Sequence, residues 1–464
     1  MRRACLFFCT ITASQVSFAG GFSLIEEGAS GLGNAYAGAA AVSHDASTIW
    51  FNPAGMTELK EKQFLAAGHI IDVNSDFRDQ GTTLNSAFGA GFVDPNFATA
   101  GAVDAGGVAF IPNLYYVQPL RRGVTLGIGV SIPFGNSTEY DDDWVGRYQA
   151  VESSVTAIDI NPSIAFRVNE KLSIGGGFSV QYLAATLANA VDTDAICIGL
   201  FPPDTCVTTG LTQPGTLAND GFAEVEGDSV AFSANLGVLF KPRAGTKLGV
   251  AFRSGLEHEL EGDAEFTNNP ILEGILTQAG VNLFQDGGVT AEASLPPTAM
   301  FSAAHKITDH IELLADATWT GWSSFDELRV EFDNPLQPDT FNTIEYEDVW
   351  RVSGGVNYEF SDRLILRAGI AYDEDPTPSP QLRTSRIPGN DRFWLAVGGG
   401  YQFSERIGFD VGFAHLMLDD TPIANVGESA GGTTTRGVFE ADANIFSAQA
   451  VSYTHLTLPT ICSV

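Results

Sequence analysis

The sequence predicts an all-β fold, a fourteen-stranded antiparallel β-barrel that spans a membrane and is plugged by an N-terminal hatch. Three observations predict it. From residue 62 onward, strand-like runs alternate apolar and polar side chains. Very short polar links between these runs alternate with long polar or glycine-rich segments, which is the pattern of an outer-membrane barrel. The segment before them, residues 20–61, does not alternate.

Residues 1–19 have the form of a secretory signal peptide. Arg2 and Arg3 supply a positive start, an apolar run follows, and Ser17-Phe18-Ala19 offers small residues for cleavage. No later stretch has 18 uncharged apolar residues, so we expect no membrane-spanning helix. A membrane role would therefore have to come from alternating strands.

Residues 20–61 are rich in small side chains, as in Gly28-Ala29-Ser30-Gly31-Leu32-Gly33. This segment is too irregular for a strand that faces lipid. Because the interior of a wide barrel can be filled by such a segment, we expect it to fold inside as a plug.

Residues 62–453 are expected to form the barrel wall. In the clearest strand, residues 172–182, Phe178 and Tyr182 fall on one face and Ser179 on the other. The short links lie at residues 121–123, 168–171, 241–246, 306–310, 361–363 and 404–406, and the long segments at residues 78–106, 141–149, 188–223, 261–287, 323–347, 373–391 and 419–436. Six tight turns that alternate with seven loops make fourteen strands, and barrels of this kind have an even number.

Charge and cysteines exclude some partners. The formal net charge of −32 argues against nucleic acid, because phosphates are bound by basic surfaces. It fits either a soluble, salt-adapted surface or loops that bind divalent cations beside lipopolysaccharide. Cys197 and Cys206 lie close together in a loop-like segment without a nearby histidine, so we expect a disulfide in an exported chain rather than a metal site.

Aromatic residues gather in pairs near the expected strand ends: Tyr115 and Tyr116, Trp144 and Tyr148, Trp319 and Trp322, Trp350 and Tyr358, and Trp394 and Tyr401. Tryptophan and tyrosine are enriched at the two interfaces of a membrane, so these residues suit interfacial girdles. Core packing would also use them, and the sequence leaves both interpretations open.

Several motifs are more specific than the alternation. They are, in order, Gly20-Gly21-Phe22-Ser23-Leu24, Ser30-Gly31-Leu32-Gly33-Asn34-Ala35-Tyr36-Ala37-Gly38, Asn52-Pro53-Ala54, Trp319-Thr320-Gly321-Trp322-Ser323-Ser324-Phe325, Arg367-Ala368-Gly369-Ile370-Ala371-Tyr372-Asp373 and Ile387-Pro388-Gly389-Asn390-Asp391-Arg392-Phe393-Trp394. From about residue 20 to 450, this series resembles the FadL family of outer-membrane long-chain fatty-acid transporters (the OmpP1/FadL/TodX type).

The resemblance implies a plugged fourteen-stranded barrel in the outer membrane of a Gram-negative bacterium, surrounded by lipid and lipopolysaccharide. It implies passive uptake without a cofactor, by a chain that we expect to be a monomer. An outer groove would capture the lipid, an inner pocket would bind it more tightly, and a kinked third strand would open the wall sideways. Phe22 matches a hatch phenylalanine of the family, so we expect it to reach the inner pocket, and the hatch motif Asn52, Pro53 and Ala54 is intact.

Residues 130–140 are expected to form the third strand. Pro133 removes a backbone donor there, and Gly135 weakens the strand. A proline at a strand end is the ordinary explanation, whereas the family position favours an opening of the wall.

Three arginines on neighbouring strands are predicted to face the interior. The apolar residues beside Arg351, Arg367 and Arg392 alternate with them and face lipid, where a charge would cost roughly 2–4 kcal/mol at the midplane. Each arginine could bind a fatty-acid carboxylate or pair with an acid such as Asp373 to hold the hatch to the wall. Arg147 is a further candidate of the same kind.

An outer groove would need apolar side chains in the long loops. The candidates are Ile198, Phe201, Leu272, Ile275, Leu276 and Phe284. The spacing of Leu272, Ile275 and Leu276 predicts a short amphipathic helix over residues 269–280. Such residues can pack against one another or capture a lipid.

The substrate class and two further points stay open in the sequence. A carboxylate-binding arginine would favour fatty acids, whereas a wholly apolar pocket would favour aromatic or aliphatic hydrocarbons. A lipase-type enzyme would need a serine–histidine pair at the barrel wall, and we identify none and expect no enzyme. A general porin would lack the hatch. Residues 454–464 depart from the family pattern, and we expect them to be non-native sequence.

Overall fold

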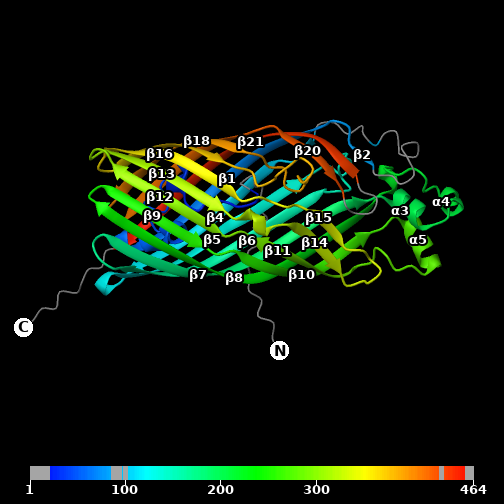
Figure 1. Ribbon diagram of the computed structural model, residues 1–464, viewed down its shortest axis with the longest axis horizontal. Helices are drawn as coiled ribbons and strands as arrows, with labels where there is room; N and C mark the ends of the chain where they lie inside the picture. Colours follow the sequence, from blue (N-terminus) through cyan, green and yellow to red (C-terminus); the bar gives the residue numbers. More distant parts are fainter. Residues whose placement is uncertain (1–20, 85–96, 98–102, 428–432, 455–464) are drawn as a thin grey trace, which may run out of the picture.

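The computed structural model describes residues 21–84, 97, 103–427 and 433–454. The chain forms one long, closed β-barrel with helices at one end (Figure 1). Fourteen antiparallel strands make the wall, which confirms the predicted fold class. The predicted signal peptide (residues 1–19) and residues 455–464 of the predicted non-native tail lie outside the described residues, and β21 ends at Thr454.

Nine wall strands are continuous and five are interrupted. The continuous ones are β1 (Lys62–Asp79), β4 (Gly107–Pro119), β5 (Val124–Glu139), β6 (Glu152–Arg167), β7 (Leu172–Val191), β8 (Gly221–Arg243), β17 (Leu364–Asp373), β18 (Arg392–Ser404) and β21 (Thr433–Thr454). The interrupted ones are β9 (Thr246–Arg253) with β10 (Leu256–Thr267), β11 (Gly287–Leu295) with β12 (Thr298–Lys306), β13 (Ile311–Thr320) with β14 (Glu327–Phe332), β15 (Thr340–Thr343) with β16 (Val349–Ser361), and β19 (Ile407–Leu418) with β20 (Thr421–Val426). Short strands β2 (Thr83–Leu84) and β3 (Val103–Asp104) extend the outer edge. The pairing of β1 with β21 closes the barrel.

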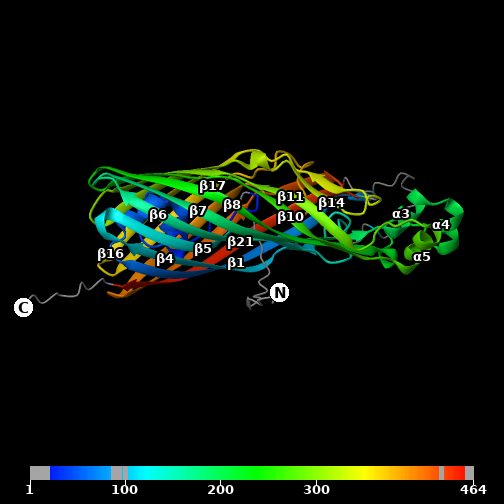
Figure 2. The same cartoon turned by 90° about the horizontal axis from the view of Figure 1, so that it is seen from below.

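The connections sort by length between the two ends, as predicted. Tight turns gather at one end, whereas the opposite end carries the long segments with α3 (Thr193–Leu200), α4 (Pro203–Thr209) and α5 (Pro270–Ala279) (Figures 1 and 2). Some predicted loops are in fact strands, because β10 continues to Thr267 and β14 pairs with β15 inside the segment of residues 323–347.

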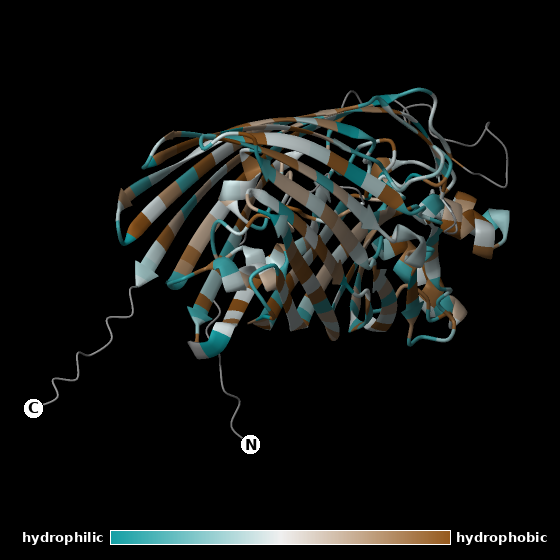
Figure 3. Ribbon diagram, turned by 60° about the vertical axis from the view of Figure 1, so that its left-hand side comes forward, coloured by the Kyte–Doolittle hydropathy of each residue, from teal (hydrophilic) through white to brown (hydrophobic). Residues whose placement is uncertain are grey.

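The alternation of side chains separates lipid-facing from interior positions. In β7, Phe178 is 49% exposed on the outside of the barrel, whereas the neighbouring Ser179 is buried inside it. Figure 3 shows the same banding of hydrophobic and hydrophilic residues along the wall. An apolar outer belt of this kind fits a bilayer. No helix within the described ranges is long and apolar enough to cross a membrane.

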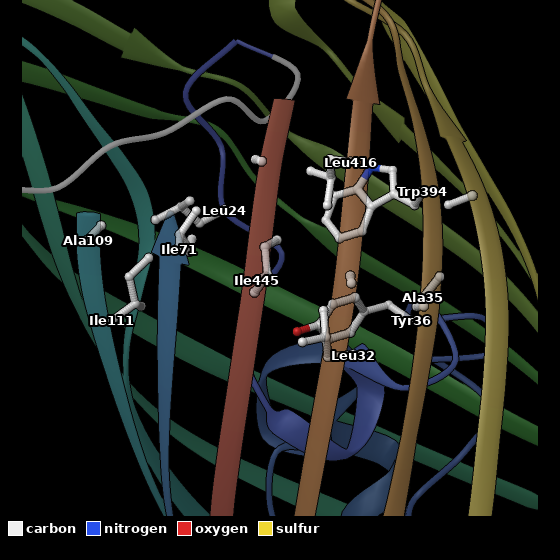
Figure 4. Packing of buried hydrophobic residues seen from close by; sticks show 14 of the residues in the cluster. Leu24, Leu32, Ala35, Tyr36, Ile71, Ala109, Ile111, Trp394, Leu416 and Ile445 are labelled. Carbon is white, nitrogen blue, oxygen red and sulfur yellow. The ribbon is translucent and has the colours of Figure 1, made fainter. Parts of the chain in front are cut away.

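The hatch fills the interior, as the sequence predicts. Its short elements are α1 (Ala29–Leu32), α2 (Thr48–Phe51) and the 3-10 helix η1 (Pro53–Glu58). Leu32 and Tyr36 pack in one cluster with Trp394, Leu416 and Ile445 of the wall (Figure 4). A core of buried hydrophobic side chains therefore joins the hatch to the wall.

The hatch motif of Asn52, Pro53 and Ala54 anchors this plug. The Asn52 side chain accepts a hydrogen bond from the Ala54 N–H and donates to the carbonyls of Ala40 (2.6 Å) and of Val238 in β8 (3.0 Å). Hatch and wall approach so closely that a Cβ atom added at Gly237 would lie 2.0 Å from Asn52 Oδ1. A glycine is required there.

Most of the aromatic residues expected in interfacial girdles divide into two groups. Tyr116, Trp350, Tyr358 and Tyr401 are exposed on the outer face, whereas Tyr115, Trp144, Tyr148, Trp322 and Trp394 are buried. Trp144, Trp322 and Trp394 face the interior or the loop core rather than the membrane interface. Packing inside the molecule therefore explains these three positions.

Candidate transport pathway

An apolar cavity lies between the tip of the hatch and the outer end of the barrel. It encloses about 820 Å³ of atom-free space, which includes the open solvent at its openings. Its aliphatic and aromatic lining consists of Phe22, Val155, Leu183, Ala185, Leu187, Val225, Leu260, Val289, Ala291, Ala293, Leu295, Phe325, Leu328, Val330 and Ile387. Asn136, Ser153, Glu226, Gly227, Gly262 and Arg386 complete it. Such a space can bury a hydrocarbon chain.

Phe22 closes the inner end of this cavity. Its ring is 4% exposed and lies 5.0 Å from the ring of Trp322, 5.6 Å from that of Phe325 and 5.9 Å from that of Phe134. The preceding Gly21 has a φ of +65°, and a Cβ atom there would lie 2.5 Å from the Trp322 ring. Glycine thus lets the chain pass Trp322 and insert Phe22.

An outer groove adjoins the other end of the cavity. Its lining includes Phe284, Phe266, Phe332 and Phe341 from the outer strands and loops. Groove and cavity share five lining residues, which are Leu187, Val225, Leu328, Val330 and Arg386. The two spaces therefore meet at one neck.

The helices at the outer end form a cap that is held by its own core. Cys197 and Cys206 are joined in a disulfide between α3 and α4. Leu272 and Leu276 of α5 are buried against it, and Ile198, Phe201 and Ile275 are partly buried in the same cluster. Asn269 caps α5 and Gly280 follows it, so the predicted helix is confirmed. Of the six predicted groove residues, Phe284 lines the groove, while the other five belong to the core of the cap.

A second, polar pocket lies beyond the pair of Phe22 and Trp322. Hatch residues Ser23, Leu24 and Ile25 line it together with Arg253, Arg351 and Asp373, whose carboxylate is paired with Arg392. The Arg253 guanidinium stacks on Trp50 at 3.6 Å and donates to Ser179 Oγ at 2.8 Å. Arg351 donates to the Ala35 carbonyl, and its Nε and Nη1 have no hydrogen-bond partner among the described residues.

All three strand arginines point inward, as the alternation predicts, but their partners differ. Arg367 pairs with Asp410 at 2.6 Å and Arg392 with Asp373 at 2.8 Å, so these two hold the wall together. Arg147 likewise pairs with Asp220 at 2.7 Å. Within the described residues, Arg351 has no acidic group within 4.0 Å.

The third strand leaves its neighbour half-way along the barrel. Pairing of β4 with β5 stops at Leu114 and Val130, so the described residues Gly107–Asn113 of β4 have no partner on β5. Between Ser131 and Phe134, β5 has one residue more than the facing segment of β6. Pro133 is in this bulge.

The hatch takes the place that β4 leaves. The Leu24 N–H donates to the Pro133 carbonyl at 2.8 Å, and the Gly135 N–H donates to the Phe22 carbonyl at 3.0 Å. Glu27 Oε2 accepts hydrogen bonds from Asn113 and Tyr115 of β4. The hatch thus bridges both edges of the split and satisfies backbone groups that lipid cannot satisfy.

The sequence did not single out three residues of this pathway. The direction of Arg253 could have been predicted from the alternation along β9. Val250 and Phe252 are exposed on the outer face, so the neighbouring position of Arg253 faces the interior. The sequence places Trp322 in a family motif and in an expected girdle, but gives no sign that it lies beside Phe22. Arg386 lies in a loop, where no periodicity predicts the direction of a side chain.

A serine and a histidine do meet in the wall. His69 Nδ1 of β1 bonds to Ser447 Oγ of β21, but its Nε2 has no partner within the described chain. In the described part of the chain, no third group bonds to Nε2 and orients the ring as hydrolytic sites require. Among the described residues there is also no cluster of three His, Cys, Asp or Glu that could hold a metal ion.

The family model described as outer membrane protein transport protein (OMPP1/FadL/TodX) matches residues 10–454. The chain belongs to this family. Outer membrane protein P1 of Haemophilus influenzae is 30% identical over 452 residues, which cover 92% of this chain and 94% of that protein. A long-chain fatty acid transport protein of Escherichia coli O6:H1 is 28% identical over 87% of this chain and 88% of that one.

The fold agrees with a solved structure. The crystal structure of a Pseudomonas aeruginosa FadL homologue has a TM-score of 0.83 and 24% identity, and covers 94% of this chain and 100% of that one. Members of the OMPP1/FadL/TodX family are transport proteins of the outer membrane. The chain is therefore a multi-pass outer-membrane protein of a Gram-negative bacterium that transports hydrophobic molecules.

Proposed function

We propose that this chain takes up long-chain fatty acids, holds them in the apolar cavity above Phe22, and releases them sideways where β5 leaves β4. One observation carries the proposal: the tip of the hatch contacts both the apolar cavity and the kinked strand. The hatch tip closes the apolar cavity with Phe22 and, through Phe22 and Leu24, bonds to the kinked part of β5. A substrate that displaces Phe22 would therefore also uncover the split in the wall.

The polar pocket beyond Phe22 favours fatty acids over aromatic or aliphatic hydrocarbons. Arg351 is buried with two unpartnered donor atoms, and Arg253 lines the same pocket. A hydrocarbon would leave Nε and Nη1 of Arg351 without a hydrogen-bond partner, whereas a carboxylate would accept hydrogen bonds from them. The paired Arg147, Arg367 and Arg392 are better explained as structural residues. In this proposal the outer groove beside Phe284 captures the lipid.

The chain would work without a cofactor and as a monomer among outer-membrane lipid and lipopolysaccharide. A closed barrel supports this proposal, because one chain supplies the whole wall and the whole cavity.

Uptake by cells distinguishes the two substrate classes. Cells without a fatty-acid transporter of their own would express this chain and receive radiolabelled oleate or radiolabelled hexadecane. We expect saturable oleate uptake, which Arg351→Gln lowers and the matched Arg367→Gln control lowers only through protein level. Saturable hexadecane uptake that oleate does not compete with would contradict the proposal and favour the hydrocarbon channel.

A further inference from the structure

Arg386 is carried into the barrel by the segment between β17 and β18. Its carbonyl accepts hydrogen bonds from Asn136 Nδ2 (2.9 Å) and Thr138 Oγ1 (3.3 Å), and the Ser385 carbonyl accepts one from Tyr140 Oη (2.6 Å). Asn136 and Thr138 belong to β5 beyond its kink, and Tyr140 directly follows that strand. The backbone is thus fixed against the inner face of β5, which fixes where the side chain begins.

The Arg386 guanidinium is a buried cation without an acidic partner. It is 7% exposed, and Nη1 donates to the Glu152 carbonyl (3.0 Å) and Ser153 Oγ (2.8 Å). Its Nε has no partner, and no carboxylate of the described residues lies within 4.0 Å. In contrast, Arg383 of the same segment pairs with Asp375 at 3.0 Å.

Burial lowers the pKa of Arg386 to about 10, and the nearby Tyr140 opposes that shift. The side chain therefore keeps its charge at neutral pH. A buried charge without a counter-charge is costly, so folds rarely retain one unless a bound group completes it.

Arg386 also occupies a distinctive place along the pathway. Of the five residues shared by the outer groove and the apolar cavity, it is the only charged one. Phe22 and Phe325 close the opposite end of the cavity. A cation therefore stands at the outer neck of a space that is otherwise built to hold a hydrocarbon chain.

We propose that Arg386 binds the carboxylate of a fatty acid whose tail lies in the apolar cavity and points toward Phe22. This inference rests on the proposed function and adds an orientation to it, because the substrate enters tail first. In this pose the tail presses on Phe22, while the carboxylate remains on the outer side of Phe22 and Trp322. Arg351 is reached only after the hatch tip has moved.

The first test compares an acid with its ester in the purified, delipidated protein. We expect the wild type to bind oleate more tightly than methyl oleate. Arg386→Gln should weaken oleate binding about tenfold or more, as expected for a charged hydrogen bond, and leave methyl oleate unchanged. Arg386→Lys should retain most of the preference. The Arg383→Gln control should lower heat stability and keep the ratio of the two dissociation constants.

A folded Arg386→Gln barrel that keeps the wild-type preference for oleate would overturn the inference, and so would an equal loss for acid and ester. If the wild type itself binds oleate no better than methyl oleate, the proposed function fails before any variant is made. The two failures are therefore distinguishable.

The second test uses the wild type and so does not depend on the folding of a variant. A fatty acid with a diazirine at its terminal methyl end would be bound and photolysed, and the labelled peptides identified. Tail-first entry predicts labels on the hatch tip around Phe22 and on the Phe325 segment. Labels on Leu187, Val330 or the groove would mean that the tail points outward, and would overturn the inference.

Discussion

Truncation of Phe22 to alanine should detach the hatch tip from the wall. The buried ring packs against Trp322, Phe325 and Phe134. Loss of a buried phenylalanine ring costs about 3–5 kcal/mol, whereas the two backbone hydrogen bonds from the tip to β5 contribute about 1 kcal/mol each. The loss is larger than what these bonds supply. The tip should therefore leave β5 for much of the time, while the paired strands of the wall stay folded.

A detached tip removes the floor of the apolar cavity, so we expect the Kd of oleate to rise about tenfold or more, since each 1.4 kcal/mol corresponds to a factor of ten. Titration calorimetry in detergent measures Kd, and the heat-dependent mobility of the barrel in gels reports folding. Phe22→Leu keeps most of the apolar volume and should stay near the wild-type Kd. Unchanged oleate affinity in a folded Phe22→Ala barrel would refute the role of Phe22.

Two further predictions concern the hatch and the cap. Burial raises the pKa of Glu27 to about 8, so its stabilisation is full below about pH 4.5 and is lost as the pH rises through 8. The Tm should fall between pH 5 and 9 more steeply for the wild type than for Glu27→Gln, and equal slopes would refute this. Replacing Cys197 and Cys206 by serine removes a cross-link worth about 2–3 kcal/mol in loop entropy. Proteolysis within residues 193–209 should become faster. The oleate Kd should stay unchanged, because neither cysteine lines the apolar cavity. An unchanged proteolysis rate would show that the cap does not depend on the disulfide.

The wall could be predicted where lipid constrains both faces of a strand. Phe178 outside and Ser179 inside follow from that constraint. Beyond the bilayer, water accepts charged residues on the outer face, and β10 there exposes Glu257, Glu259 and Glu261. The apolar signal disappears at those positions although the strand continues. The loop segments predicted from the sequence were therefore too long.

The alternation of side chains along a strand shows which way each one points, but not which residue it contacts. Asp373 of β17 is opposite Arg392 of β18 in one register and opposite Arg351 of β16 in the other, but its carboxylate bonds to Arg392. The alternation fixes the face on which a side chain lies, whereas the residue opposite it also depends on the geometry of the connecting turn. Arg386 was missed because loops have no period, and its position depends on hydrogen bonds to β5.

The sideways exit is tested most directly by deletion of Pro133. Since β5 has one residue too many between its pairs Ser131–Asp159 and Phe134–Ala157, the deletion lets Ile132 pair with Ile158. The straightened strand can then also pair with residues 107–113 of β4.

Oleate uptake by cells is the measurement, with the amount of folded barrel, its Tm and its oleate Kd measured alongside. Pro133→Ala, which keeps the extra residue and the bulge, is the control and should retain uptake. We expect that deletion of Pro133 raises the Tm, leaves oleate bound in the apolar cavity, and reduces uptake to the level of cells without the transporter. Full uptake through a barrel whose straightened β5 is verified by its structure would contradict the sideways exit and favour passage along the barrel axis.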